Sequence, residues 1–373
     1  MKKKDTVQQA FFTLLKAGLW EQNVRLAPFG EIDFNAVLQL AEEQSVVGLI
    51  AAGLEHVEDR KPAKKDLLQF VGQALQLEQQ NAAMNYFIGV LVDKMRTEGI
   101  YTLLVKGQGI AQCYERPLWR SCGDVDFFLS EENYEKAKNY LTPLAVSVEK
   151  EGEEKKHLGM TIDPWVVELH GTLHSGLSSR VDKGLDVIKK DVFYGGHVRS
   201  WLNGSTQVFL LSVNDDAIYV FTHILQHFYK GGIGVRQVCD LCRLLWSFRI
   251  DIDHQLLERR LKAMGLVTEW RAFGAFAVEY LGMPSGAIPL YSPDKKWKRK
   301  ADKICSFIME VGNFGHNRDF SYYQKYPYLV RKSISLCQRI GDLTRHAQIF
   351  PLDSLRFFPK IFFNGLRSAY KGE

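Results

Sequence analysis

The sequence predicts a mixed α/β (α+β) fold in which a small mixed sheet lies between two sets of helices. Helical patterns fill the first 98 residues, strand-like runs concentrate between residues 99 and 206, and helical patterns dominate from there to the end. A strand–helix–strand unit followed by a hairpin needs helices on its faces to bury its apolar side chains. We therefore expect an N-terminal helical layer (1–98), an α/β core (99–206) and a helical C-terminal domain (207–373).

Composition places the chain among ordinary globular proteins. Its 373 residues are 46% hydrophobic and 24% charged, which is enough for two domains and a sizeable core. The net charge of +5 would help attract a polyphosphate, but it is too small to indicate nucleic acid by itself. The sequence has no apolar stretch of membrane-spanning length, no signal-peptide pattern and no disulfide-like cysteine spacing. We therefore expect a cytoplasmic protein.

Three helices are expected before the sheet. Residues 6–20 have an amphipathic pattern, and residues 33–56 read as one helix with Asp33 as its N-cap. A long helix over residues 63–97 follows, and Gly99 closes it. These helices would cover the sheet from the N-terminal side.

The central stretch reads as strand, glycine turn, helix and second strand. The β-branched, apolar run Tyr101–Val105 favours a buried strand, and the turn Lys106-Gly107-Gln108-Gly109 interrupts it before a short helix over residues 110–114. A glycine turn that opens a helix leaves backbone N–H groups free, which suits phosphate. Lys106 at this turn, and Arg120 shortly before the second strand, are cations that can contact phosphate.

The second strand carries two acids, Asp124 and Asp126, before the apolar run Phe127-Phe128-Leu129. Residues two apart on a strand point to the same face, so the two carboxylates lie side by side. Such a pair repels itself in a buried strand unless a cation compensates. Mg²⁺, which takes carboxylate and phosphate oxygens, is the natural cation here.

The rest of the chain alternates strands and then helices. Ser130 caps a helix that runs to Leu141, strands are expected at 145–148, 158–162 and 165–170, and residues 171–206 read as irregular. Alternation along the third of these strands places Val166, Glu168 and His170 on one face. Further helices are expected at 217–229, 235–248, 253–264, 268–281, 294–311 and 322–346.

The motifs Lys106-Gly107 and Gly123-Asp124-Val125-Asp126-Phe127 resemble the polymerase-β-like nucleotidyltransferase superfamily, and most closely the bacterial uncharacterised nucleotidyltransferase family. The resemblance covers about residues 85–200. The superfamily usually has Ser or Gly after the first glycine of the turn, whereas this chain has Gln108.

The resemblance implies an enzyme that moves a nucleoside monophosphate from an NTP to a hydroxyl and releases pyrophosphate. It implies two Mg²⁺ ions on Asp124, Asp126 and Glu168, with Glu168 as metal ligand or general base. ATP is the first candidate for the NTP, and the hydroxyl-bearing acceptor is unidentified. The nucleotide would be bound by Lys106, Gly107, Gln108 and Arg120, and the substrate side would include His170, Arg236 and Asp240.

Two other classes of function stay open. Gln108 at the glycine turn leaves room for a non-catalytic nucleotide-binding or interaction protein that keeps the fold. The spacing Glu168-x-His170-x-x-x-His174 leaves room for a zinc hydrolase. Nucleic acid is not expected as the main acceptor, because no aromatic and basic module recurs beside the glycine turn.

Three further patterns have structural explanations. His223 and His227 share a helix face and are expected in the core or at a cleft wall, and Cys239-x-x-Cys242 has no second cysteine pair. The basic, aromatic run at residues 355–371 is expected to pack as a terminal helix on the helical domain, with membrane-surface contact as the alternative.

Overall fold

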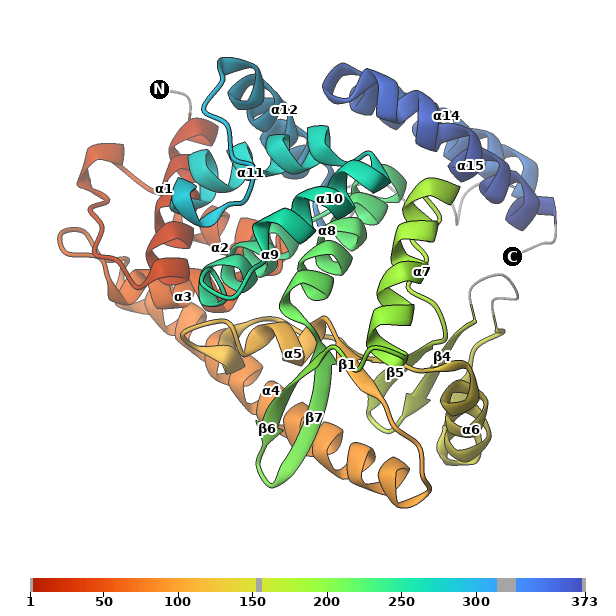
Figure 1. Ribbon diagram of the computed structural model, residues 1–373. Coiled ribbons are helices and arrows are strands. Elements are labelled where there is room, and N and C mark those ends of the chain that lie inside the picture. The colour runs from red at the N-terminus through yellow and green to blue at the C-terminus, as the bar shows by residue number, and fades with distance from the viewer. Residues whose placement is uncertain (1–2, 152–155, 314–326, 371–373) are drawn as a thin grey trace.

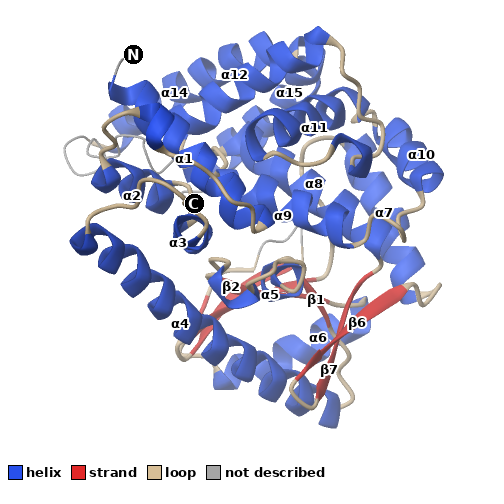
Figure 2. Ribbon diagram, turned by 90° about the vertical axis from the view of Figure 1, so that its left-hand side faces the viewer, coloured by secondary structure: helices blue, strands red, loops and turns tan. Residues whose placement is uncertain are grey.

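A seven-stranded mixed sheet forms one half of the molecule, and a helical assembly forms the other (Figures 1 and 2). The computed structural model describes residues 3–151, 156–313 and 327–370. The strand order is β3-β4-β5-β2-β1-β7-β6. The strands are β1 (Leu103–Val105), β2 (Asp124–Phe128), β3 (Ser147–Val148), β4 (His157–Ile162), β5 (Trp165–His170), β6 (Val198–Asn203) and β7 (Thr206–Leu211). The predicted mixed α/β class is confirmed.

The two faces of the sheet differ in polarity. Val125, Phe127, Val167 and Leu169 are almost fully buried on one face. They pack there against apolar residues of the long helix α4 (Lys64–Thr97) and of α6 (Glu131–Leu141). Because side chains alternate along a strand, the acids of β2 and β5 lie on the opposite face. That face is directed toward the helical half (Figure 1).

The helical half is built from both ends of the chain. One apolar core contains residues of the first helices and of the helices that follow the sheet. Trp20 Nε1 on the first helix donates a hydrogen bond of 2.6 Å to the carbonyl of Leu281. The helices in this half are α1 (Lys3–Trp20), α2 (Phe34–Glu43), α3 (Val47–Glu55), α7 (Ser179–Phe193), α8 (Val213–Lys230), α9 (Val235–Ser247), α10 (His254–Met264), α11 (Val267–Leu281), α12 (Lys295–Val311), α14 (Tyr328–Ile349) and α15 (Pro351–Tyr370). The division of the chain into three parts stays a prediction.

Helix starts follow the local chemistry of the sequence. The side chains of Asp33, Ser130 and Ser212 each accept a hydrogen bond from a backbone N–H three residues later, at the starts of α2, α6 and α8. Each cap satisfies a donor that the first helical turn leaves unpaired. The predicted caps at Asp33 and Ser130 are therefore confirmed, and Ser212 caps α8 in the same way.

The single helix expected over residues 33–56 is wrong, because the chain breaks between α2 and α3. Ser45 has a positive φ of 56°, which ends the first helix. At the break, the buried side chain of Gln44 bonds to two residues far along the chain. Its Oε1 accepts from the N–H of Val235 at 2.9 Å, and its Nε2 donates to the carbonyl of Ile308. A tertiary bond to the first turn of α9 thus replaces helix continuity.

The irregular segment expected over residues 171–206 is also wrong. It contains α7, whose N-cap Ser178 accepts from the N–H of Val181, and the strand β6. The buried residues Val181, Leu185, Ile188 and Val192 recur at helical spacing. The hairpin to β7 turns at Gly204, which has a φ of 61°. The helical spacing of these apolar residues and the turn glycine Gly204 were both present in the sequence.

The short helix after β1 begins earlier than expected. The predicted span was 110–114, but α5 covers Gly107–Ala111, so the glycine turn is itself the first helical turn. The C-terminal run forms most of α15, and Phe357 on this helix is fully buried. The start of the helix predicted at 322–346 lies outside the described residues. Among the described helices, none has both the length and the apolar character needed to cross a bilayer.

Candidate active site

Strand register brings three carboxylates to one place on the polar face. In the parallel pairing of β2 with β5, Asp126 is directly opposite Glu168, and Asp124 is two residues earlier on β2. Oxygen atoms of Asp124, Asp126 and Glu168 all lie within 4.8 Å of one another. Asp126 is 2% exposed, so the central carboxylate of the three is buried.

Lys106 supplies the nearest positive charge. It ends β1, where Val105 pairs with Asp126, and its Nζ lies 2.9 Å from Asp126 Oδ1. Its backbone has a φ of 57°, a region that a non-glycine residue adopts at a cost. This strained turn aims the side chain back at the carboxylates instead of along the sheet edge.

Gly107 allows the turn to approach β2 closely. A Cβ at this position would lie 3.3 Å from Cys122 Sγ and 3.5 Å from the carbonyl oxygen of Asp124. Gln108, the next residue, is buried and turned toward α4, where its Nε2 donates to Asn81 Oδ1 at 2.7 Å. The side chain of Gln108 therefore points away from the carboxylates, and Gly107 and Lys106 are the turn residues that face them.

Asp124 and Asp126 differ in their electrostatic surroundings. Burial and the neighbouring Asp126 carboxylate raise the pKa of Asp124. Burial also opposes ionisation of Asp126, but the charge of Lys106 and a hydrogen bond from His170 lower its pKa below the ordinary value. The less compensated carboxylate of the pair is Asp124.

Two histidines hold Glu168. His157 Nε2 donates to Glu168 Oε2 at 3.0 Å, and His170 Nε2 lies 3.4 Å from the same oxygen and 2.7 Å from Asp126 Oδ1. These hydrogen bonds hold the pKa of Glu168 well below its usual range. Burial alone would lower the pKa of His170, but its bonds to Asp126 and Glu168 raise it.

His157 was not expected from the sequence. It belongs to β4, and the antiparallel pairing of β4 with β5 places it directly opposite His170. The signal was the turn Asp163-Pro164. Counting back from a two-residue hairpin turn pairs residue 162 with 165 and residue 157 with 170.

Arg120 and Asp240 form a buried pair on the other side of the site. Arg120 Nε donates to Asp240 Oδ1 at 3.0 Å, and one of its terminal nitrogens donates to Oδ2 at 2.6 Å. Tyr114 Oη donates to the same Asp240 Oδ1 at 2.7 Å. The remaining terminal nitrogen of Arg120 is buried without a hydrogen-bond partner. Asp240 therefore pairs with Arg120, which lies 120 positions away along the chain.

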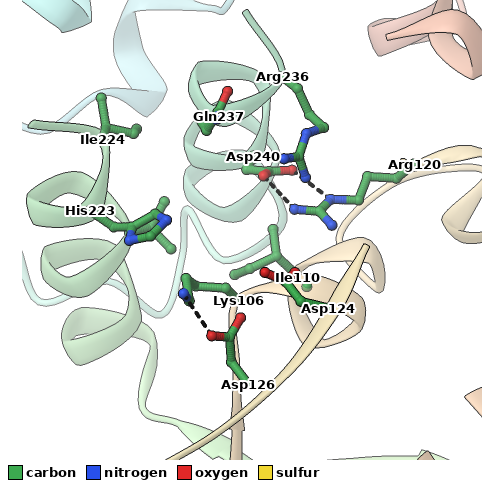
Figure 3. Close-up of a pocket in the computed structure, with 12 residues that line it drawn as sticks. Lys106, Ile110, Arg120, Asp124, Asp126, His223, Ile224, Arg236, Gln237 and Asp240 are labelled. Atoms are coloured by element: carbon green, nitrogen blue, oxygen red, sulfur yellow. Dashed lines mark hydrogen bonds and ion pairs between the residues drawn. The ribbon is translucent and has the colours of Figure 1, made fainter. Parts of the chain in front are cut away.

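Arg236 lies beside the pair as an additional cation. One of its terminal nitrogens donates to the carbonyl of Ser121 at 2.9 Å. Burial and the neighbouring Arg120 lower the pKa of Arg236. The two guanidinium groups thus stand together with a single carboxylate, Asp240, between them (Figure 3).

The two acids of β2, the lysine of the turn and the charged groups around Asp240 line one cleft between the sheet and the helices α8 and α9. Its empty volume, which includes space open to solvent, is ≈ 520 Å³. Figure 3 shows Lys106 and Asp126 at one end and Arg120, Arg236 and Asp240 at the other. The lining residues are Lys106, Gly107, Ile110, Arg120, Asp124, Asp126, Val220, His223, Ile224, Arg236, Gln237 and Asp240.

Other residues singled out in the sequence lie apart from the carboxylates. His174 Nε2 donates to Asp186 Oδ1 on α7 at 2.7 Å, so the expected zinc set of Glu168, His170 and His174 does not assemble. His223 and His227 are hydrogen-bonded to each other, with Nε2 atoms 3.1 Å apart, and His223 lines the cleft. Cys239 and Cys242 are buried free thiols.

The profile of a family described as uncharacterised nucleotidyltransferase matches residues 30–282. The chain belongs to this family. The match runs from α2 through the sheet to the end of α11, so it includes every residue that lines the cleft. Membership of the uncharacterised nucleotidyltransferase family supports nucleotidyl transfer as the general reaction. Searches of curated proteins and of solved structures each found no match.

The donor set fits the divalent metal that nucleotidyltransferases use. Asp124, Asp126 and Glu168 offer only carboxylate oxygens, the ligand type of hard cations such as Mg²⁺. Burial raises the pKa of Asp124 although the charges of Lys106 and Arg236 act to lower it, and a divalent ion would supply further compensation.

Proposed function

We propose that the chain is a Mg²⁺-dependent nucleotidyltransferase that transfers a nucleoside monophosphate from an NTP to a hydroxyl. The acceptor oxygen forms a bond to the α-phosphorus, the bond from that phosphorus to the bridging oxygen breaks, and pyrophosphate leaves. The observation that carries the proposal is the register of β2 with β5, which sets Asp126 against Glu168 beside Asp124.

Asp124, Asp126 and Glu168 would hold Mg²⁺, two ions in the full site, which when bound neutralise phosphate charge and favour the ionised form of the acceptor hydroxyl. His157 and His170 fix the orientation of Glu168 through the two bonds to its Oε2. With that oxygen held by two donors, we assign Glu168 to metal binding in preference to proton abstraction. ATP is our first candidate for the nucleotide.

The cations of the cleft would bind the triphosphate. Lys106 stands beside the carboxylates and can place its ammonium group against a phosphate oxygen near the reacting end. Arg120 and Arg236 stand at the other end, and the buried unpaired nitrogen of Arg120 is available to a phosphate oxygen. Asp240 fixes the plane of the Arg120 guanidinium through two bonds, so little side-chain freedom is lost when an anion binds.

The acceptor would occupy the helical wall of the cleft. Val220 and Ile224 on α8 present an apolar surface there, and His223 lies between them on the same helix. A small molecule with a hydroxyl and an apolar body fits this wall. A nucleic-acid strand would instead need an extended basic surface with stacking side chains.

The test is a transfer assay with each α-labelled NTP in the presence of Mg²⁺, together with a measurement of released pyrophosphate. Glu168→Gln should bind Mg²⁺–NTP with near wild-type affinity, because Asp124 and Asp126 can hold the ion that accompanies the nucleotide. It should transfer label more slowly, because the second ion loses a carboxylate ligand. The matched control is Glu132→Gln, which changes an exposed acid on α6 far from the cleft. Transfer at the wild-type rate by Glu168→Gln would remove this residue from the reaction.

A second candidate function is nucleotide binding without transfer. It is favoured by the 2.9 Å contact of Lys106 with Asp126, which together with His170 already neutralises the central carboxylate. In that case the protein would bind NTP in equilibrium dialysis and release no pyrophosphate with any acceptor pool. Pyrophosphate release that depends on Asp124 would exclude it.

A further inference from the structure

The polar face of the sheet carries a second group of metal-binding side chains next to the three acids. His157 on β4, and Glu168 and His170 on β5, place a ring nitrogen, a carboxylate oxygen and a second ring nitrogen within 4.8 Å of one another. The group follows directly from register, since His157 and His170 are cross-strand partners and Glu168 is two residues before His170. Their rings are 4.8 Å apart between centroids.

The separations within this group match those of ligands around one ion. A metal about 2.1 Å from each of its ligands holds neighbouring ligand atoms about 3.0 Å apart in octahedral geometry and about 3.4 Å apart in tetrahedral geometry. His157 Nε2 and His170 Nε2 lie 3.0 and 3.4 Å from Glu168 Oε2. An ion can therefore replace the hydrogen bonds with little movement of the three side chains.

The group is also accessible and has a further carboxylate near it. The side chains of His157 and Glu168 are 34% and 27% exposed, so an ion can enter from solvent. Gly159 is the cross-strand partner of Glu168, and a Cβ there would come within 2.6 Å of Glu149 Oε2. The missing side chain lets the Glu149 carboxylate lie close to this part of the sheet, which adds to the attraction for a cation.

We propose that His157, Glu168 and His170 form a second cation site, for a divalent transition-metal ion of the class of Mn²⁺, Co²⁺ and Zn²⁺. Imidazole nitrogen suits these ions, whereas Mg²⁺ prefers an all-oxygen set such as Asp124, Asp126 and Glu168. The two sites share Glu168, so the active centre would hold unlike metals side by side. The inference does not depend on nucleotidyl transfer, because the ion binds in the absence of nucleotide.

Occupation of this site changes the neighbouring carboxylate. His170 Nε2 now donates to Asp126 Oδ1 at 2.7 Å. As a ligand it would present its lone pair to the ion, its Nε2 proton would pass to solvent, and Asp126 would keep only Lys106 as a partner. The second site would thus remove one of the two donors that Asp126 Oδ1 now has, His170 and Lys106.

The experiment uses the full chain, freed of metal by a chelator and titrated with Co²⁺ alone, with its ligand-field absorption recorded at each step. Wild-type protein should bind one Co²⁺ with nitrogen-ligand bands, and His157→Ala should weaken that binding by about 100-fold or more. His174→Ala is the matched control, since this nearby histidine pairs with Asp186 outside the group. Asp124→Asn removes an acid of the magnesium site only.

The two controls should both keep the Co²⁺ bands, and circular dichroism should show all variants folded. His157→Gln, which keeps a polar side chain of similar reach, replaces His157→Ala if the alanine variant does not fold. Unchanged Co²⁺ binding in the folded His157 variant would overturn the proposal. So would the absence of nitrogen-ligand bands in wild-type protein, or their loss in Asp124→Asn. Absence of NTP transfer by wild-type protein that shows the bands would instead count against the proposed function.

Discussion

Asp240 on α9 holds Arg120, in the loop before β2, through two hydrogen bonds of 3.0 and 2.6 Å inside the protein. Both side chains are less than one tenth exposed. The pair therefore ties the helical half to the loop that precedes the two catalytic candidates on β2. Removing one partner leaves a buried charge without compensation, which costs far more than the pair itself contributes.

Asp240→Asn should accordingly lower the free energy of unfolding by about 3–5 kcal/mol. The double variant Arg120→Met with Asp240→Leu should recover part of that loss, because the charge of Arg120 is removed together with that of its partner. Urea denaturation of Arg120→Met, of Asp240→Leu and of the double variant measures the coupling energy between the two residues. Removal of the exposed pair of Lys136 and Glu132 on α6 serves as control and should change stability little. Equal losses at the two sites would contradict the role of burial.

The two acids of β2 should respond oppositely to loss of charge. Asp124→Asn removes a carboxylate whose pKa is raised by burial and by Asp126, so the variant should unfold at the same or a higher temperature at neutral pH. Asp126→Asn leaves Lys106 and His170 without the negative charge of their acceptor and should unfold at a lower temperature. Thermal unfolding followed by circular dichroism checks both. Mg²⁺–NTP binding should be lost in each variant that stays folded.

A buried acid in the helical half should make stability depend on pH. Burial and the nearby carboxylate of Asp353 raise the pKa of Glu269 on α11 from 4.5 to about 8. The folded protein therefore holds a proton that the unfolded chain releases. The contribution to stability is fully present below pH 4.5, the value for the unfolded chain, and is lost as the pH rises toward about 8.

The free energy of unfolding should fall over that interval by at most about 1.4 kcal/mol per pH unit from this one group. Glu269→Gln keeps the shape and removes the titration, so its stability should not share this decline. Urea denaturation at a series of pH values between 5 and 8 compares the two proteins. The same slope in both would show that other groups are responsible.

Lys106→Ala should weaken binding of a nucleoside triphosphate more than binding of the corresponding nucleoside. Alanine has a similar backbone cost at the φ of 57°, so the variant tests the ammonium group and leaves the turn conformation unchanged. Calorimetric titration with both ligands gives the comparison. Equal losses of affinity would place Lys106 away from the phosphates.

The acids of the site could be predicted because they depend on local periodicity. Side chains two residues apart on a strand point to the same face. This rule placed Asp124 with Asp126, and Glu168 with His170, correctly. His157 could have been found from the hairpin turn, but only after the strand β4 was extended by one residue beyond its expected start at 158.

The pairing of Arg120 with Asp240 could not have been predicted, because it joins residues 120 positions apart through the packing of α9 on the sheet half. Arg236, four residues before Asp240, was the local partner that the sequence offered. The burial of Gln108 against Asn81 is equally non-local. Such contacts depend on how distant helices and strands pack together, and this packing cannot be predicted from local patterns in a single sequence.

The bond from Trp20 to Leu281 has a consequence for biosynthesis, since it joins residues 261 positions apart. At a synthesis rate of about 5–20 residues per second, the first helix would leave the ribosome on the order of tens of seconds before α11 exists. During that time α2 and α3 can already pack on α1, but the part of α1 that contacts α11 has no native cover. Incomplete chains that end before α11 would therefore expose this part of α1 to chaperones and proteases.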